Sequence, residues 1–268
     1  MDSPKKTPVH LIGARASNEK ELGHLAKEFS DHLEGDSNID LTLDIKQEAP
    51  EESCVVYARK VLETLPKSNE LNGPLIIAST GVNDVEYEDA ETPVVLAPNL
   101  SIEVVEALVR KLPEMKENHP NADFLIIEAH QKAKESIPGT AKEGAKILME
   151  DSKVENVVIK SMEEWEEFAK NPLIHLGKIV SVRCDEISEK IFKVPDEAIG
   201  GHGIHKFIAY EDEGKVDEVE TQVLGRKAYA EGLGQLIQLL ENSPDEFKKG
   251  VTSIFELVQK NLLKVEKA

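Results

Sequence analysis

The sequence predicts an α/β protein, in which a Rossmann-like parallel-sheet domain precedes an α+β domain with an open mixed sheet. Two observations lead to this prediction. Short apolar runs alternate with helical patterns over the first hundred residues, and several strand patterns follow one another in the second half. Alternating strands and helices form a parallel sheet covered by helices, whereas successive strands pair as antiparallel neighbours.

The composition of the chain restricts the domain number, the partners and the location that we expect. A chain of 268 residues suits one large or two modest domains, and its 40% hydrophobic and 31% charged residues are typical of a globular protein. The net charge of −19 disfavours nucleic acid and anionic membranes as partners. The sequence shows no transmembrane run or signal peptide. Cys54 and Cys184 lie in apolar contexts without metal-ligand spacing, so we expect reduced thiols, no metal site and a cytoplasmic location.

The first half begins with a strand over residues 9–12, which Gly13 ends. Asn18 and Glu21 have the spacing of a capping box and predict a helix that runs to about Leu33. Four further apolar or alternating segments predict the remaining strands, at residues 39–45, 54–57, 75–79 and 94–97.

The second half opens with Ser101, which predicts the cap of a helix to about Lys111. Ser161 and Glu164 predict a second capped helix. Apolar or alternating runs predict strands at residues 124–127, 157–159, 180–184, 207–209 and 219–223. Two apolar helical stripes close the chain, over residues 229–240 and 243–262.

The stretch from Glu128 to Ala141 combines features that could bind an anion. It reads as the end of a strand, a polar loop and a helix start, with Thr140 and Glu143 as a capping box for a helix over residues 141–149. A helix start favours anions because its first N–H groups lack partners, and Gly139 leaves the backbone open to a ligand. His130 and Lys134 add an imidazole and a proton donor. The alternative is a charged surface loop whose threonine merely caps a helix.

This stretch resembles the dihydrodipicolinate reductase signature, E-A-H-H-x-x-K-x-D-x-P-S-G-T-A. Eight positions match, with the His-to-Lys and Lys-to-Pro spacings kept: Glu128, Ala129, His130, Lys134, Pro138, Gly139, Thr140 and Ala141. Gln131 replaces the second histidine, Ser136 replaces the aspartate, and the serine before Gly139 is missing. The resemblance is best over residues 71–240.

The resemblance implies a 4-hydroxy-tetrahydrodipicolinate reductase, which reduces a cyclic imine dicarboxylate with NADH or NADPH in lysine and diaminopimelate biosynthesis. His130 would orient the substrate, and Lys134 would protonate the ring nitrogen as the general acid. Gln131 and the amides of Gly139 and Thr140 would bind the substrate. The resemblance also implies a homotetramer and C-terminal helices that return to the first domain.

Candidate cofactor residues come from three segments that resemble parts of the family. They are the first turn, a G-T-T-G-like turn and an A-P-N-F-S-like segment, and they supply Gly13, Arg15, Ser79, Thr80, Gly81, Ala97 and Asn99. The first turn keeps only the first glycine of the G-x-G-x-x-G pattern that lets a backbone approach a pyrophosphate. Dinucleotide binding, or its loss, therefore stays open.

We expect a Rossmann-like nucleotide-binding domain with a degenerate glycine turn over residues 1–100 and 233–268. A substrate-binding and oligomerisation domain would take up residues 101–232. Two other functions fit the altered motifs: a non-catalytic reductase-like binding protein that has lost dinucleotide binding, or a reductase for a different small acid. His202 and His205 could face a ligand or be structural.

Overall fold

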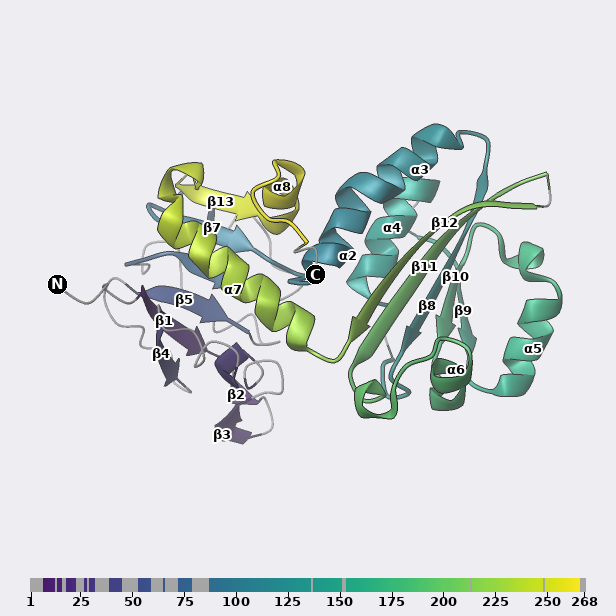
Figure 1. Ribbon diagram of the computed structural model, residues 1–268, viewed down its shortest axis with the longest axis horizontal. Coiled ribbons are helices and arrows are strands. Elements are labelled where there is room, and N and C mark those ends of the chain that lie inside the picture. The colour runs from purple at the N-terminus through teal and green to yellow at the C-terminus, as the bar shows by residue number, and fades with distance from the viewer. Residues whose placement is uncertain are drawn as a thin grey trace. The chain divides into compact units, whose positions relative to one another are not determined.

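The computed structural model (Figure 1) consists of two compact units, Met1–Ile102 with Arg226–Ala268, and Glu103–Gly225. The structure describes residues 7–12, 14–15, 18–22, 27, 29–31, 39–44, 53–58, 65, 72–78, 87–135, 137–150, 153–212, 214–247 and 249–265. In these residues no helix is both long enough and apolar enough to span a membrane.

The first unit contains a six-stranded sheet in the order β4-β1-β5-β6-β7-β13, and every neighbouring pair is parallel. Its strands are β1 (Thr7–Ile12), β4 (Ile39–Asp44), β5 (Cys54–Tyr57), β6 (Leu75–Ile77), β7 (Pro93–Leu96) and β13 (Gly250–Ser253). The central strands β5 and β6 are buried throughout, as expected where a parallel sheet is covered on both faces. The predicted Rossmann-like sheet is confirmed.

The second unit contains a five-stranded mixed sheet in the order β12-β11-β8-β10-β9. Its strands are β8 (Asp123–His130), β9 (Asn156–Ile159), β10 (Ile179–Val182), β11 (His202–Glu211) and β12 (Gly214–Leu224). Strands β8, β10 and β9 run parallel, whereas β11 is antiparallel to both β8 and β12. The predicted open mixed sheet is therefore confirmed.

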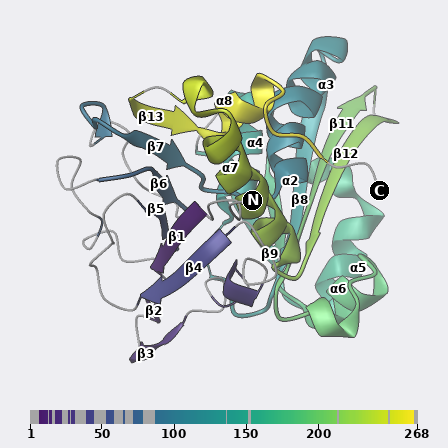
Figure 2. The same cartoon turned by 60° about the vertical axis from the view of Figure 1, so that its left-hand side comes forward.

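Helices cover both faces of the second sheet (Figures 1 and 2). They are α2 (Ile102–Glu106), a π-helical turn (Ala107–Lys111), α3 (Leu112–Asn118), α4 (Gly139–Met149), α5 (Met162–Lys170) and α6 (Asp185–Lys190). Phe168 of α5 and Ile187 of α6 pack with Ile127 of β8 in one apolar core. Helix α4 lies on the opposite face, where Gly144 contacts the ring of Phe207.

Two helix-boundary predictions have different outcomes. Ser161 caps α5 as predicted: its Oγ accepts a hydrogen bond from the Glu164 amide at 3.2 Å, which confirms the cap. The helix predicted to end near Lys111 instead continues to Asn118. A π-helical turn ends two residues before Pro113, and such a wider turn accommodates a residue that has no N–H to donate.

The helix predicted to start at Asn18 is wrong at its beginning. Two short strands, β2 (Ala14–Arg15) and β3 (Asn18–Leu22), pair antiparallel there. A hydrogen-bonding partner strand has overridden a capping signature that was only local. Helical residues come later, at Lys27 and at 29–31, where Phe29 is fully buried.

The end of the chain lies in the first unit, as expected. The prediction of a second helix there, over residues 243–262, is wrong. Helix α7 (Lys227–Asn242) is followed by a 3-10 turn (Pro244–Glu246), strand β13 and the short helix α8 (Ile254–Gln259). Gly250 has φ of 85°, a conformation that breaks a helix and that glycine adopts without strain. Residues with a helical apolar stripe therefore form a strand, because the edge of β7 supplies its hydrogen-bond partners.

Candidate functional site

The site is built on β8, which carries Glu128 and ends at His130. Helix α4 begins at Gly139, not at Ala141, so the predicted cap by Thr140 is wrong. Pro138 is extended, with φ of −59° and ψ of 146°, and occupies the position that precedes the first helical residue. Thr140 is already inside the first turn, where its side chain cannot serve as the N-cap. Gly139 and Thr140 still contribute amides at the helix start.

Polar side chains form a row across one face of the sheet. Glu128 pairs in register with His205 of β11 and with Ser181 of β10, and His205 pairs with Thr221 of β12. Residues in register on neighbouring strands point to the same face, so these four side chains are adjacent. All four are buried. The same face carries Phe207, on which α4 packs.

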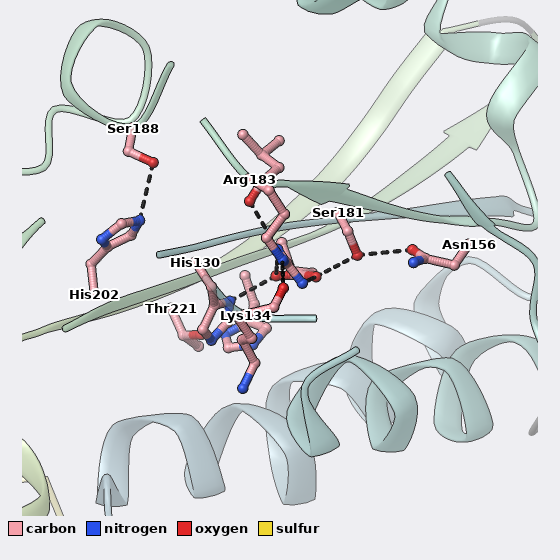
Figure 3. Close-up of polar contacts among 11 residues, drawn as sticks. His130, Lys134, Asn156, Ser181, Arg183, Ser188, His202 and Thr221 are labelled. Atoms are coloured by element: carbon pink, nitrogen blue, oxygen red, sulfur yellow. Dashed lines mark hydrogen bonds and ion pairs between the residues drawn. The ribbon is translucent and has the colours of Figure 1, made fainter. Parts of the chain in front are cut away.

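Glu128, at the centre of this row, forms an ion pair with Arg183. Figure 3 shows the side chains of Arg183 and Ser181 in this cluster. Nη1 of Arg183 donates to Oε2 of Glu128 at 2.9 Å and Nη2 donates to Oε1 at 2.5 Å. Ser181 donates from Oγ to Oε1 of Glu128, and Oδ1 of Asn156 lies 2.8 Å from the same hydroxyl. The carboxylate is therefore held on both of its oxygens.

The pKa of Glu128 reflects two opposed influences. Burial is the largest and raises the pKa, because it disfavours the charged form. Hydrogen bonds from His130 and Arg183, with the positive charge beside the carboxylate, outweigh burial and lower the pKa to about 2. Glu128 is therefore ionised and can only accept hydrogen bonds.

His130 is oriented by this carboxylate. Its Nδ1 lies 2.7 Å from Oε2 of Glu128, and since an ionised carboxylate only accepts, Nδ1 carries the proton. In the neutral ring, Nε2 is then an acceptor. Burial, together with the positive charges of Lys134 and Arg183, lowers the pKa of His130 more than Glu128 raises it, so the neutral ring is favoured. A Cβ at residue 203 would lie 2.9 Å from Nε2, so Gly203 makes room for the ring.

Lys134 lies in the loop after β8 and is tied to the same ion pair through its backbone. Its carbonyl oxygen accepts a hydrogen bond from Nε of Arg183 at 2.8 Å. Its ammonium is close enough to lower the pKa of both His130 and His205 electrostatically. The structure thus brings the two predicted catalytic side chains into one electrostatic neighbourhood.

His205 lies beside His130, with the ring centroids 5.2 Å apart in an edge-to-face arrangement. Its Nδ1 is 3.4 Å from Oγ1 of Thr221, and Nε2 has no hydrogen-bond partner in the described part of the chain. Burial lowers the pKa of His205 to about 3, helped by nearby positive charge. This imidazole is therefore neutral at ordinary pH.

The second histidine of uncertain role, His202, is structural. Its Nδ1 donates to the carbonyl of Ile199 at 2.9 Å, and its Nε2 lies 3.0 Å from Oγ of Ser188. Both ring nitrogens are used, and both side chains are buried. Figure 3 shows His202 and Ser188 away from Arg183 and His130. No group of three His, Cys, Asp or Glu side chains within the described ranges could hold a metal ion.

No protein-family model and no curated protein matches the sequence. A dihydrodipicolinate reductase from Paenisporosarcina sp. TG-14, solved with dipicolinate bound, is 16% identical with a TM-score of 0.58 over 96% of this chain and 100% of its own. The chain has the dihydrodipicolinate reductase fold. A meso-DAPDH mutant from Clostridium tetani E88, solved with DAP, is 10% identical with a TM-score of 0.48 over 97% of each chain.

In this reductase fold, the candidate cofactor residues follow the carboxyl ends of β1, β6 and β7. Because those strands are parallel, their carboxyl ends meet at one edge of the sheet, where nucleotides bind in open α/β sheets. Gly13, Ser79, Thr80 and Gly81 lie outside the described residues. Ala97 is buried, and Oδ1 of Asn99 accepts a hydrogen bond from the Ser101 amide at 2.9 Å.

Arg15 lies in the β2–β3 hairpin, directly after β1. A Rossmann pyrophosphate site needs the N-terminus of a helix at this point, approached through glycines. The described part of the turn offers a strand pair instead, so it does not fit that site. The edge of the sheet suits a nucleotide, but its phosphates would need other partners.

Sequence analysis missed Arg183 and Ser181, and it assigned no role to Glu128. The signal in the sequence was the position of Arg183 directly after an apolar strand, where an arginine is expected to be buried. A buried guanidinium needs a carboxylate or carbonyl oxygens as hydrogen-bond partners. The residue that it meets is 55 positions away in the chain, and no local pattern identifies it.

Proposed function

We propose that the protein reduces a cyclic imine dicarboxylate of the 4-hydroxy-tetrahydrodipicolinate kind, in lysine and diaminopimelate biosynthesis, with NADH or NADPH. The observation that supports this proposal is the shared anchoring of His130 and Lys134. One buried ion pair, Glu128–Arg183, contacts the imidazole of the first residue and the backbone of the second. A surface loop with a merely charged composition would not need such an anchor.

The residues of this chain would divide the work on the substrate. His130 would accept a hydrogen bond at Nε2 and thereby orient the ring, while Lys134 would give its proton to the ring nitrogen as that nitrogen gains electrons. Gln131 is half-buried and would donate from its carboxamide. The amides of Gly139 and Thr140 would bind a carboxylate at the start of α4.

A substrate with two carboxylates must overcome the net charge of −19. The Arg183 guanidinium is already paired with Glu128, so it adds little attraction. Lys134 and the positive end of the 11-residue helix α4 are therefore the proposed local attraction for the dicarboxylate. The nicotinamide cofactor would supply the hydride. No step is assigned to its phosphates, because the hairpin at Arg15 does not fit them.

The test is the rate of NADH or NADPH oxidation with 4-hydroxy-tetrahydrodipicolinate, for wild type, Lys134→Ala and Lys132→Ala. A positioned proton donor contributes roughly two to four orders of magnitude in rate, so Lys134→Ala should lose that much. Lys132 is exposed in the same loop, and its replacement should leave the rate unchanged. Equal rates for all three proteins, or no rate above background in any, would remove the proposal.

A second candidate is a reductase-like binding protein that has lost the dinucleotide. The hairpin β2–β3, in place of a helix start after β1, favours it. It predicts that pyridine-2,6-dicarboxylate binds and raises the melting temperature while NADH and NADPH do not. A dinucleotide present at 100 times its dissociation constant should stabilise by about 2.7 kcal/mol, a shift that is easily measured. Such a shift would reject this candidate.

Two finer features follow from the resemblance alone. The altered Gln131 and the missing serine before Gly139 allow a different small acid as the substrate, and a panel of imine acids in the same assay would identify it. We also infer a homotetramer. Light scattering on the purified chain should give four times 29.7 kDa, whereas a monomer mass would contradict the inference.

A further inference from the structure

Four hydrogen bonds from the guanidinium of Arg183 to described residues have separate functions. Two go to the oxygens of Glu128, and Nη1 also donates to the carbonyl of Val182 at 2.8 Å. The fourth, from Nε, goes to the carbonyl of Lys134 at 2.8 Å. One planar group therefore connects a side chain of β8 with the backbone of the loop that follows it.

Glu128 makes the corresponding connection to His130. Its Oε2 accepts from both Nη1 of Arg183 and Nδ1 of His130, at 2.9 and 2.7 Å. A shift of the carboxylate would therefore displace the imidazole and the guanidinium together. The loop carbonyl and the ring proton depend on one ion pair.

Stability alone is a weak reason for this ion pair. Removing two charges from water costs about as much as their attraction returns, and well-packed apolar residues often replace such pairs without loss. What apolar residues cannot supply is a fixed proton position on the imidazole and a donor for the loop carbonyl. The pair is therefore better explained by the positions that it imposes on the imidazole and the loop than by its effect on stability.

We propose that Glu128 and Arg183 are positioning residues that set the His130 tautomer and the Lys134 loop together. Glu128 keeps the His130 proton on Nδ1 and so leaves Nε2 as the acceptor that faces a ligand. Arg183 holds the backbone of the loop that carries Lys134, through the hydrogen bond from its Nε to the Lys134 carbonyl. This inference rests on the proposed function, since it assigns the same two residues to the ligand.

The main test variant replaces the pair as a unit, with Glu128→Leu and Arg183→Met in one chain. Removing only one of the two charges would leave the other buried and uncompensated and could unfold the protein, whereas the double replacement is expected to fold. A second variant, Arg183→Lys, keeps a positive charge beside Glu128 but loses the Nε donor to the Lys134 carbonyl. Ser181→Ala is the matched control, because it removes another hydrogen bond to Glu128 and touches neither His130 nor the loop.

Two measurements separate positioning from stability. Nitrogen-15 NMR of the histidine rings reports which nitrogen of His130 carries the proton, with His130→Gln for assignment. Calorimetry reports the affinity for pyridine-2,6-dicarboxylate without any cofactor. We expect the double variant to lose the Nδ1–H tautomer and about ten- to a hundredfold in affinity. Arg183→Lys should keep the tautomer and lose affinity, and Ser181→Ala should keep both.

An unchanged His130 tautomer in a folded double variant would overturn the inference. If that variant does not fold, an unchanged affinity in Arg183→Lys would overturn it instead. If wild type does not bind the dicarboxylate, the proposed function fails. In that case the position of the His130 proton in the double variant still tests the inference. If the double variant also does not fold, the inference is overturned when the wild-type His130 ring does not carry its proton on Nδ1.

Discussion

Replacing His205 with phenylalanine should make the protein less sensitive to acid. His205 is buried against rings on two sides, edge-to-face with His130 and stacked on Phe207 at 6.3 Å between centroids. A phenyl ring therefore suits its surroundings and removes a nitrogen, Nε2, that has no partner among the described residues. It also removes a group that titrates in the unfolded chain.

The size of the effect follows from the pKa of His205, about 3 in the folded protein against 6.5 for the free side chain. Between these values the unfolded state binds a proton that the folded state does not bind. Lowering the pH therefore favours unfolding, and the neutral His205 makes its full contribution to the free energy of unfolding only above pH 6.5. One pKa unit corresponds to about 1.4 kcal/mol, so wild type should lose about 2 to 3 kcal/mol through His205 between pH 7 and pH 4.5.

The assay is urea unfolding of wild type and His205→Phe at several pH values. The difference between the two free energies of unfolding should shift by about 2 to 3 kcal/mol in favour of the variant as the pH falls from 7 to 4.5. Comparison at equal pH cancels contributions from other groups, including Glu128. Thr221→Val keeps the imidazole and should follow wild type. A shift below about 1 kcal/mol would refute the reasoning about burial.

Three further changes test packing and capping. Gly144→Ala should gain about 1 kcal/mol of helix propensity, but it would place a Cβ 2.2 Å from Cε1 of buried Phe207. Denaturant unfolding should therefore show a net loss of about 1 to 3 kcal/mol in the free energy of unfolding. The additional change Phe207→Leu should relieve that loss. Gly232→Ala should lower the melting temperature more than Gly144→Ala, because its Cβ would lie 1.8 Å from the backbone oxygen of Leu100, and a backbone atom cannot move aside as a side chain can. A smaller decrease than that of Gly144→Ala would contradict this reasoning. Ser161→Ala should cost about 1 kcal/mol through the lost cap of α5 while Ser161→Gly costs less, and equal losses in urea titration would argue against capping.

Much of the fold could be predicted because its signals are local. The buried strands β5, β6 and β7 are short apolar runs, and the succession of β8, polar loop and α4 is continuous in the chain. Predictions failed where a partner strand competed with a local pattern. Residues 18–22 have a capping signature, and residues 250–253 belong to an apolar helical stripe, yet both are strands because neighbouring strands supply hydrogen bonds.

By itself, the sequence determined the α/β class, the resemblance to dihydrodipicolinate reductases and the nomination of His130 and Lys134, because those features depend on residues close together in the chain. Only the tertiary structure decided what holds these two residues. Arg183 lies 49 positions from Lys134 and 55 from Glu128, and it reaches both because β10 pairs in parallel with β8. Sheet register sets which side chains share a face, and register depends on the whole sheet rather than on any one segment.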